Sequence, residues 1–327
     1  MNVLVCGGAG YIGSNMTAVL ASGGHKPIVF DNLSKGHKEA VKGQELIEGD
    51  LANFDLLVKV LKENKIDAVM HFAAFIEVGE SVEKPLEFYR NNFSNTRTLL
   101  AAMEKTGVRK FVFSSTAAVY GMPKTVPITE DLHKEPINPY GESKWAVERM
   151  CHFQSQTGRL NYATLRYFNA CGAGKNGTIG EDHKPESHLI PLIIAAAMGK
   201  RADIKVFGTD YPTPDGTCIR DYIHIEDLCS AHLLALEKLD KHKELVYNLG
   251  NGKGYSVKEV IETVKKVTGK SFKITEVARR AGDPPVLTAN ATKAIKEIGW
   301  RLKYPQLEKI VETAWLWHSK NPNGYAE

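Results

Sequence analysis

The feature that most constrains the fold is a glycine-rich turn near the amino terminus, in the stretch MNVLVCGGAGYIGSNM. The β-forming residues 3–5 precede the glycines, and a helical pattern follows them. Gly7, Gly10 and Gly13 fit G-x-x-G-x-x-G, and Gly8 starts an overlapping G-x-G-x-x-G. Such glycines allow a tight turn and let the backbone approach a pyrophosphate, which then lies at the amino terminus of the helix. The stretch therefore predicts the strand, turn and helix of a dinucleotide-binding unit.

The next strand pattern, KPIVFDN, closes with a carboxylate. Asp31 lies 18 residues beyond Gly13, where an acidic side chain can accept hydrogen bonds from the hydroxyls of an adenosine ribose. Because Asp31 would repel a 2′-phosphate, we expect NAD rather than NADP, although the nearby Lys35 works against this discrimination. The alternative is that Asp31 only caps a turn.

Strand and helix patterns then alternate along the first half of the chain, in QELIEGDLAN, FDLLVKVLKEN, IDAVMHFAA, PLEFYRNNFSNTRTLLAAMEKTG and VRKFVFSSTAAVYG. This alternation predicts an α/β fold with a doubly wound parallel sheet of the Rossmann type, joined by right-handed crossovers. Ligands of such folds bind at the carboxyl ends of the strands. The residues at those ends are Gly7 to Gly13, Asp31, Asp50, Ala73 with Ala74, and Ser114 to Thr116.

Composition and charge argue against several other classes of protein. Of the 327 residues, 43% are hydrophobic and 24% are charged, which is typical of a soluble globular protein. The net charge of +4 comes from scattered lysines and arginines, so we expect no nucleic-acid partner. No apolar run reaches the roughly 18 residues of a membrane span. Five cysteines without a C-x-x-C pair, and no signal peptide, indicate reduced thiols in a cytoplasmic protein.

NPYGESK, residues 138–144, places Tyr140 and Lys144 four positions apart in a segment with a helical pattern. The two side chains therefore share one face of a helix, one turn apart. Spacing alone also fits a packed tyrosine beside a surface lysine, because such pairs are common on any helix. The rest of the chain has to supply the context.

That context is a set of motifs in one order across nearly the full chain: GGAGYIG, FDNLSKG, GDL, HFAA, VGESVEKPLEFYRNN, FSSTAAVYG, NPYGESK, RYFNACG, DGTCIRDYIHIEDL and YNLGNGKGYSVKEV. By these motifs the sequence closely resembles the UDP-glucose 4-epimerases, within the extended short-chain dehydrogenase/reductase group. The glycine, SST and Tyr-x-x-x-Lys elements are shared by the whole group. VGESVEKP and GTCIRDYIH are much narrower and indicate the epimerase branch.

The resemblance implies a catalytic set of Tyr140, Lys144 and Thr116. Tyr140 would exchange a proton with the sugar hydroxyl, although a free phenol has a pKa of about 10. The Lys144 cation and the positive nicotinamide would lower the pKa of Tyr140 toward the working pH, and Lys144 would also hold the nicotinamide ribose. Thr116 stands where many relatives carry serine. Ser115 is the alternative, although alternation along a strand turns it to the other face.

The implied reaction is the reversible epimerisation of UDP-galactose and UDP-glucose at carbon 4, through a transient 4-keto sugar and with tightly bound NAD. Tyr140 would take the proton of the 4-hydroxyl while hydride leaves carbon 4. The sugar would then turn over while its UDP stays anchored, and hydride would return to the opposite face. The resemblance therefore implies an isomerase that needs no outside redox partner.

Further binding residues are carried over from the motifs. For the cofactor, the resemblance implies Gly7, Gly10, Tyr11, Ile12, Gly13, Asp31, Asn32, Leu33, Ser34, Lys35, Gly36, Asp50, Leu51, Phe72, Ala73, Ala74, Asn91, Thr116, Tyr140, Lys144 and Phe168. For the UDP-sugar, it implies Thr116, Tyr140, Asn169, His188, Leu189, Lys205, Val206, Phe207, Arg220, Arg280 and Asp283. The two arginines would pair with the diphosphate, for which a planar bidentate cation is well suited, or else form surface salt bridges.

The less regular second half of the chain predicts a smaller, mixed α/β lobe at the carboxyl-terminal side that binds the UDP-sugar. We expect an NAD-binding domain over residues 1–170, with returning segments at about 221–251, and a UDP-sugar-binding lobe from residues 171–220 and 252–327. The family also implies a homodimer through helices near residues 88–105 and 140–157, whose apolar positions fit a core equally well.

Two positions depart from the pattern of some relatives. Ile76 stands where these relatives have a lysine near the nicotinamide, so no charge is expected there. Leu287 stands where a bulky tyrosine narrows the sugar pocket, so we expect side activity on N-acetyl forms of the substrates.

The histidines indicate no metal centre. His224 and Asp227 are three positions apart but lack a third ligand at metal spacing, and His183 and His188 lie in or beside a polar loop.

Rival functions differ in the residues that they need. A nucleotide-sugar 4,6-dehydratase or decarboxylase carries acidic residues just after the position of Thr116, where this chain has Ala117 and Ala118. A UDP-glucuronate 4-epimerase uses the same core chemistry and stays open as the alternative. A non-catalytic NAD-sensing protein on the same fold would often lack Tyr140 or Lys144, and both are present.

Overall fold

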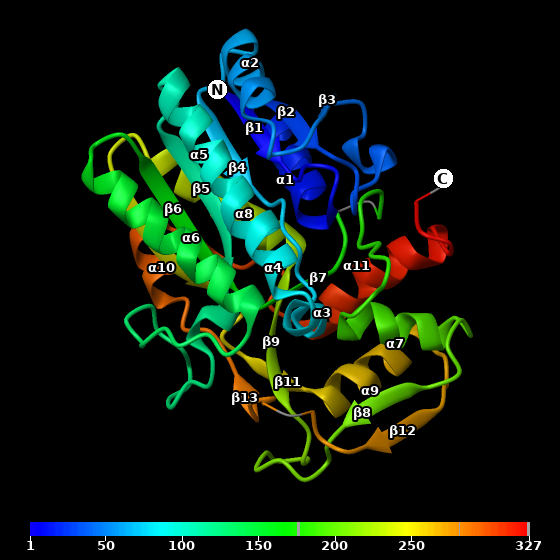
Figure 1. The fold of residues 1–327 in the computed structure, drawn as a ribbon. Helices are drawn as coiled ribbons and strands as arrows, with labels where there is room; N and C mark the ends of the chain where they lie inside the picture. The colour runs from blue at the N-terminus through cyan, green and yellow to red at the C-terminus, as the bar shows by residue number, and fades with distance from the viewer. Residues whose placement is uncertain (175–176, 281, 326–327) are drawn as a thin grey trace.

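The structure is a computed structural model that describes residues 1–174, 177–280 and 282–325. At its centre lies a seven-stranded parallel sheet with the strand order β10-β6-β5-β4-β1-β2-β3 (Figure 1). The order reverses between β1 and β4, so the carboxyl ends of these two strands flank the place where ligands of such sheets bind. The predicted doubly wound sheet is confirmed. Its strands are β1 (Asn2–Cys6), β2 (Lys26–Asp31), β3 (Glu45–Glu48), β4 (Ala68–His71), β5 (Lys110–Thr116), β6 (Asn161–Tyr167) and β10 (Glu244–Leu249).

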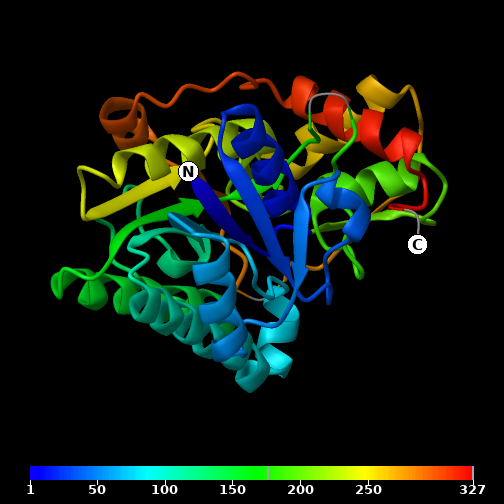
Figure 2. The same cartoon turned by 90° about the horizontal axis from the view of Figure 1, so that it is seen from above.

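Helices cover both faces of the sheet, and Figure 2 shows the sheet between the two helical layers. The first layer consists of α1 (Tyr11–Ser22), α8 (Ile225–Lys238) and α10 (Thr292–Ile298). The second layer consists of α2 (Phe54–Glu63), α5 (Asn95–Thr106) and α6 (Pro139–Gln156). Because inner strands are covered on both sides, successive residues are apolar, and Val3, Leu4 and Val5 are all 0% exposed.

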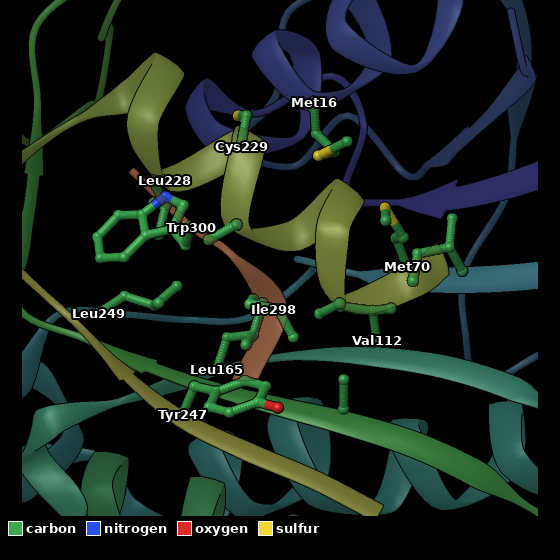
Figure 3. Packing of buried hydrophobic residues seen from close by; sticks show 14 of the residues in the cluster. Met16, Met70, Val112, Leu165, Leu228, Cys229, Tyr247, Leu249, Ile298 and Trp300 are labelled. Carbon is green, nitrogen blue, oxygen red and sulfur yellow. The ribbon is translucent and has the colours of Figure 1, made fainter. Parts of the chain in front are cut away.

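The core beneath the first layer includes a segment that we expected in the smaller lobe. Figure 3 shows Trp300 packed with Leu228 of α8, near Ile298 of α10 and Tyr247 of β10. Trp300 is fully buried, and its indole N–H donates to the carbonyl of Asp227 at 2.9 Å. The segment 291–300 therefore packs on the nucleotide-binding domain instead of the lobe.

The smaller lobe combines a four-stranded mixed sheet with a parallel pair of strands, which confirms its mixed α/β character. The sheet is formed by β7 (Asn169–Cys171), β9 (Ile219–His224), β11 (Gly254–Ser256) and β13 (Val286–Leu287), and the pair by β8 (Ile204–Phe207) and β12 (Ile274–Val277). Three helices complete its core, α7 (Leu189–Ala197), α9 (Val257–Thr268) and α11 (Leu307–Lys320). Of the segment 221–251, α8 and β10 pack in the main domain, whereas β9 belongs to the sheet of the lobe.

The long helix predicted over the stretch that ends near Gly107 is present, but it is not uniform. It consists of α4 (Pro85–Phe88), the π-helical segment η2 (Tyr89–Ser94) and α5, and Gly107 caps it with a left-handed φ of +79°. A π-helical turn within a helix is frequent at functional sites, and this one holds Asn91 and Asn92. The remaining short helices are α3 (Val78–Glu83), η1 (Lys38–Val41) and η3 (Ala117–Tyr120).

Two further expectations concern the thiols and the membrane. All five cysteines are free and buried, as expected for reduced thiols. Across residues 1–174, 177–280 and 282–325, no helix combines the length and hydropathy that a transmembrane span requires.

Candidate active site

The glycine turn between β1 and α1 has the shape of a phosphate cradle. Gly7 has a φ of +78°, and a Cβ there would lie 2.4 Å from the backbone nitrogen of Ala73. A Cβ on Gly13 would lie 2.1 Å from the carbonyl oxygen of Gly7. Gly10 differs from both. A Cβ on Gly10 would lie 3.4 Å from its nearest neighbour, and Gly10 is the N-cap residue of α1, where it has no side chain to cover the end of the helix. The first two glycines therefore shape the turn, and Gly10 leaves the N–H groups of the helix open to a pyrophosphate.

Asp31, at the end of β2, is nearly buried and holds the same turn. Its carboxylate accepts hydrogen bonds from the backbone N–H of Ala9 at 3.0 Å and of Leu33 at 2.8 Å. Burial raises the pKa of Asp31, and these two backbone donors oppose that shift. Asp31 does cap a turn, as the alternative prediction had it, but each oxygen keeps a lone pair for a ribose hydroxyl. The residues present thus fit a dinucleotide with a free 2′-hydroxyl.

Tyr140 and Thr116 meet at the carboxyl end of β5. The helix α6 begins at Pro139, and its cap Asn138 accepts a hydrogen bond from the N–H of Gly141 at 2.9 Å, which fixes where the first turn starts. In that turn the phenol of Tyr140 lies beside the Thr116 hydroxyl, which acts to lower the pKa of Tyr140. Ser115 points to the other face, where its hydroxyl donates to a buried glutamate at 2.5 Å. The structure therefore brings Tyr140 together with Thr116 and not with Ser115.

Lys144 lies one helical turn below Tyr140 and is buried. Its ammonium donates to the carbonyl of Ser114 at 2.9 Å and lies 5.0 Å from the centre of the Phe113 ring. Burial lowers the pKa of Lys144 to about 7.

The direction of the Tyr140 shift is opposite to the one we predicted. Burial raises the pKa of Tyr140, Glu77 raises it further, and only the hydrogen bond from Thr116 lowers it. The physical reason is that burial of the phenol is the largest effect, and the ammonium of Lys144 does not offset it because it is held by the carbonyl of Ser114. A Tyr140 with a lowered pKa therefore requires a further positive charge beside the phenol.

Two residues next to this pair, Asn92 and Glu77, were not predicted from the sequence. Asn92, in η2, accepts from the N–H of Phe75 at 2.9 Å and donates to the carbonyl of Phe75 at 3.0 Å and to the hydroxyl of Ser143 at 3.2 Å. It thereby ties the segment after β4 to α6. Glu77 lies close enough to influence Tyr140 and forms an ion pair of 3.3 Å with Lys35. The signal for Asn92 was a pair of asparagines inside an otherwise ordinary helical pattern.

The residues predicted to bind UDP come together in part. Arg220 and Asp283, expected at the diphosphate and at the uridine ribose, form an ion pair with each other. The guanidinium of Arg280 lies 3.9 Å from the centre of the Phe207 ring, on a strand whose Lys205 is exposed. This places cationic and aromatic groups on one side of the lobe, as a uracil and a diphosphate would need.

Several predicted contacts are restricted by where the side chains point. Val206 and Leu51 are 1% and 8% exposed and pack in hydrophobic cores, so only their backbone could reach a ligand. The amide of Asn169 donates to the carbonyl of Asp221 at 2.8 Å. The imidazole of His188 lies 2.7 Å from Glu181 instead of standing free.

Comparisons with known proteins agree with this geometry. Residues 3–250 match the model of the NAD dependent epimerase/dehydratase family. A relative named UDP-glucose 4-epimerase, from Halalkalibacterium halodurans, is 51% identical over 327 residues, 100% of this chain and 98% of its own length. The structure of UDP-glucose 4-epimerase from Bifidobacterium longum in complex with NAD+ and UDP has a TM-score of 0.94 at 39% identity, covering 99% of this chain and 100% of that one. The UDP-Glc/GlcNAc 4-epimerase of Campylobacter jejuni has a TM-score of 0.86 at 44% identity, covering 98% and 99%. On this evidence the chain belongs to the NAD dependent epimerase/dehydratase family, in the branch of the UDP-glucose 4-epimerases.

Proposed function

We propose that this protein is an NAD-dependent UDP-glucose 4-epimerase, an isomerase that interconverts UDP-galactose and UDP-glucose. The observation that carries the proposal is the pairing of the Tyr140 phenol with the Thr116 hydroxyl at the carboxyl end of β5. This pair lies at the same edge of the sheet as the glycine turn and Asp31, which fit the pyrophosphate and the ribose of NAD. The likeness to epimerases over the full chain supports the same activity.

The geometry and the family support the following roles for the catalytic residues. NAD, when bound, accepts hydride from carbon 4 of the sugar and returns it. Tyr140 takes the proton of the 4-hydroxyl and gives a proton back to the ketone oxygen. The Thr116 hydroxyl, which lies beside the phenol, would hold the phenol and the sugar oxygen in line. Lys144 anchors the nicotinamide ribose from within the helix, and Arg220 and Arg280 hold the diphosphate while the sugar turns.

The first test is an incubation of the purified protein with UDP-galactose and no added cofactor, followed by detection of UDP-glucose. We expect conversion to the equilibrium mixture, because NAD should copurify with the protein. UDP-glucuronate in a parallel incubation tests the alternative substrate. If the protein epimerises UDP-glucuronate and leaves UDP-galactose unchanged, UDP-glucuronate replaces UDP-galactose as the proposed substrate.

We also propose side activity on the N-acetyl sugars. Leu287, on β13, packs against the same hydrophobic cluster as Phe168, the residue that we expect on the nicotinamide side of the pocket. A relative named for both glucose and N-acetylglucosamine forms supports this. Leu287→Tyr should abolish turnover of UDP-N-acetylglucosamine and keep turnover of UDP-galactose. No detectable epimerisation of UDP-N-acetylglucosamine by the unchanged protein at high concentration would end the idea.

A homodimer in the cytoplasm completes the proposal. The sheet-facing positions of α5 and α6 are core, but large apolar side chains stay exposed on neighbouring surfaces, with Leu86 at 81%, Val82 at 64% and Phe153 at 59%. Exposed apolar groups on adjacent helices suit a symmetric interface. Sedimentation equilibrium should give twice the chain mass, and a monomer at micromolar concentration would reject the dimer. The five unpaired cysteines support a reducing compartment.

A further inference from the structure

The loop between β7 and α7 gathers two histidines and two glutamates within eight consecutive residues. They are Glu181, His183, Glu186 and His188, and their side chains are 3%, 19%, 20% and 36% exposed. One potential ligand atom from each residue lies within 4.8 Å of the others. The spacing Glu-x-His-x-x-Glu-x-His is local, so one loop supplies all four groups.

The separations between these atoms are close to those between the ligands of one bound cation. Nδ1 of His183 lies 3.4 Å from Glu181 and 3.6 Å from Glu186. Nδ1 of His188 lies 3.3 Å from Glu186 and 2.7 Å from Glu181. Four ligands bound to zinc at about 2.0–2.2 Å in a tetrahedron stand roughly 3.3–3.6 Å apart. The separations of His183 Nδ1 from Oε1 of Glu181 and from Oε2 of Glu186 therefore already match a zinc site, whereas His188 approaches the other oxygen of Glu186, Oε1.

Several of these atoms lie close together but do not form hydrogen bonds of regular geometry. Within the part of the chain that the structure describes, Oε1 of Glu181 and Nδ1 of both histidines lack a hydrogen bond of acceptable geometry. Glu181 carries the most weight, because its buried Oε1 faces both imidazoles, at 2.7 and 3.4 Å, without a hydrogen bond of regular geometry to either. Glu186 is oriented by its backbone neighbours, since its Oε1 accepts from the N–H of Ser187 at 2.7 Å and of His188 at 2.8 Å. Such outer contacts are typical of metal ligands.

We propose that Glu181, His183, Glu186 and His188 bind one divalent cation, with zinc as the preferred metal. Imidazole nitrogens and carboxylate oxygens are donors that zinc takes readily, and four protein ligands leave no open position for catalysis. The site is therefore structural, and it replaces our expectation that the chain binds no metal. It rests on the cluster itself and not on the proposed epimerase activity.

The metal would brace the loop against the cofactor domain. The ring of His183 lies edge-on to Tyr11, with 6.3 Å between ring centres, and the hydroxyl of Tyr11 donates to the carbonyl of Gly172 at 2.7 Å. Tyr11 is the first residue of α1, whose amino terminus forms the phosphate cradle. Metal bound by residues 181–188 would thus hold one wall of the nucleotide site in place.

Protons compete with a metal ion for the histidine nitrogens of this cluster. The two carboxylates raise the pKa of His183 to about 9 and of His188 to about 10, so a metal-free cluster would be a network of ion pairs. A direct measurement of the metal content shows whether a metal ion or protons occupy the cluster.

The test uses untagged full-length protein from a zinc-supplemented culture, analysed by plasma mass spectrometry after gel filtration. We expect about one zinc per chain, retained against a weak chelator and removed by a strong one with a fall in melting temperature. His183→Ala should lose the metal. His152→Ala is the matched control, because His152 pairs with Glu244 at 3.2 Å on the exposed surface, and it should keep the metal.

A second readout keeps the test decisive if His183→Ala does not fold. Unchanged protein, stripped of metal and titrated with Co2+, should show the intense visible absorption of tetrahedral cobalt at one equivalent. Protein that holds no stoichiometric zinc and gives no such spectrum would overturn the proposal and leave the cluster as ion pairs. Equal zinc content in His183→Ala and in the unchanged protein would overturn it as well.

Discussion

At the scale of single residues, the charge around one phenol decides the chemistry. Burial raises the pKa of Tyr140, and Lys144, whose own pKa falls to about 7, is committed to the carbonyl of Ser114. The protein by itself therefore keeps Tyr140 protonated at neutral pH. A positive charge that arrives with the dinucleotide would favour the phenolate, so that proton transfer becomes available only in the loaded enzyme.

Removal of the phenol hydroxyl tests this role. Tyr140→Phe should lower kcat for UDP-galactose by about 10²–10⁴-fold, because the proton carrier is lost. The circular dichroism spectrum and the NAD released on denaturation should stay the same. The matched control is Tyr247→Phe. Tyr247 lies in β10, and its hydroxyl donates to Glu297 at 3.0 Å, so the variant loses a phenol hydroxyl elsewhere and should keep the turnover of the unchanged protein. Tyr140→Phe with more than a tenth of the original kcat would contradict the assignment.

Residue contacts were predictable where they depend on local periodicity. The resemblance indicated Thr116, the alternation of a strand argued against Ser115, and the structure turns the two hydroxyls to opposite faces. Asn92 and the cluster around Glu181 could not be predicted in the same way. Their partners are set by how a π-helical turn and an irregular loop fold, and neither has a sequence period.

At the scale of elements, the strand, turn and helix at the amino terminus are the best determined part of the chain. Gly13→Ala places a Cβ 2.1 Å from the carbonyl of Gly7 and should reduce the free energy of unfolding by about 1–3 kcal/mol, measured in urea. Gly10→Ala has 3.4 Å of room, so it should keep that stability and lose bound NAD through contact with the pyrophosphate. Equal loss of stability in both variants would show that Gly10 also shapes the turn.

The long helix before Gly107 shows what an apolar pattern can and cannot define. Its ends were predictable from the proline at its start and the glycine at its end. The π-helical segment Tyr89–Ser94 within it was not, because one wider turn barely changes the spacing of the buried positions. That turn nevertheless places Asn92 where it ties the segment after β4 to α6.

At the scale of the whole molecule, the alternation of strands and helices was enough to predict the doubly wound sheet. It was not enough to divide the second half of the chain between the two units. The apolar positions of α10 and Trp300 indicate that they are buried, but not against which sheet, and the structure packs them on the main one. In the same way, β9 reads as a strand in either sheet and joins the lobe.

The buried histidines predict how the stability of the whole protein depends on pH. Burial lowers the pKa of His71 to about 3 and of His224 and His232 to about 4. A histidine in the unfolded chain titrates near pH 6.5. Below that pH the unfolded chain binds protons that the buried histidines of the native state do not bind. The free energy of unfolding therefore falls toward pH 4. Between pH 7 and pH 5 each imidazole should remove about 2 kcal/mol of unfolding free energy.

Urea titrations at the two pH values measure this loss directly. His232→Leu should reduce the difference between them by roughly a third, since one of the three buried imidazoles is gone. A midpoint that stays constant from pH 7 to pH 5 in the unchanged protein would contradict the expected burial of neutral histidines.

The most direct test of the proposed mechanism is the fate of the hydrogen at carbon 4. The protein is incubated with UDP-galactose in D2O until equilibrium is reached, and both sugars are examined by proton NMR. If hydride leaves carbon 4 and returns to it within one site, carbon 4 should carry no deuterium in either sugar after many turnovers. Deuterium at carbon 4 in proportion to turnover would mean that this hydrogen leaves as a proton, which would contradict the account.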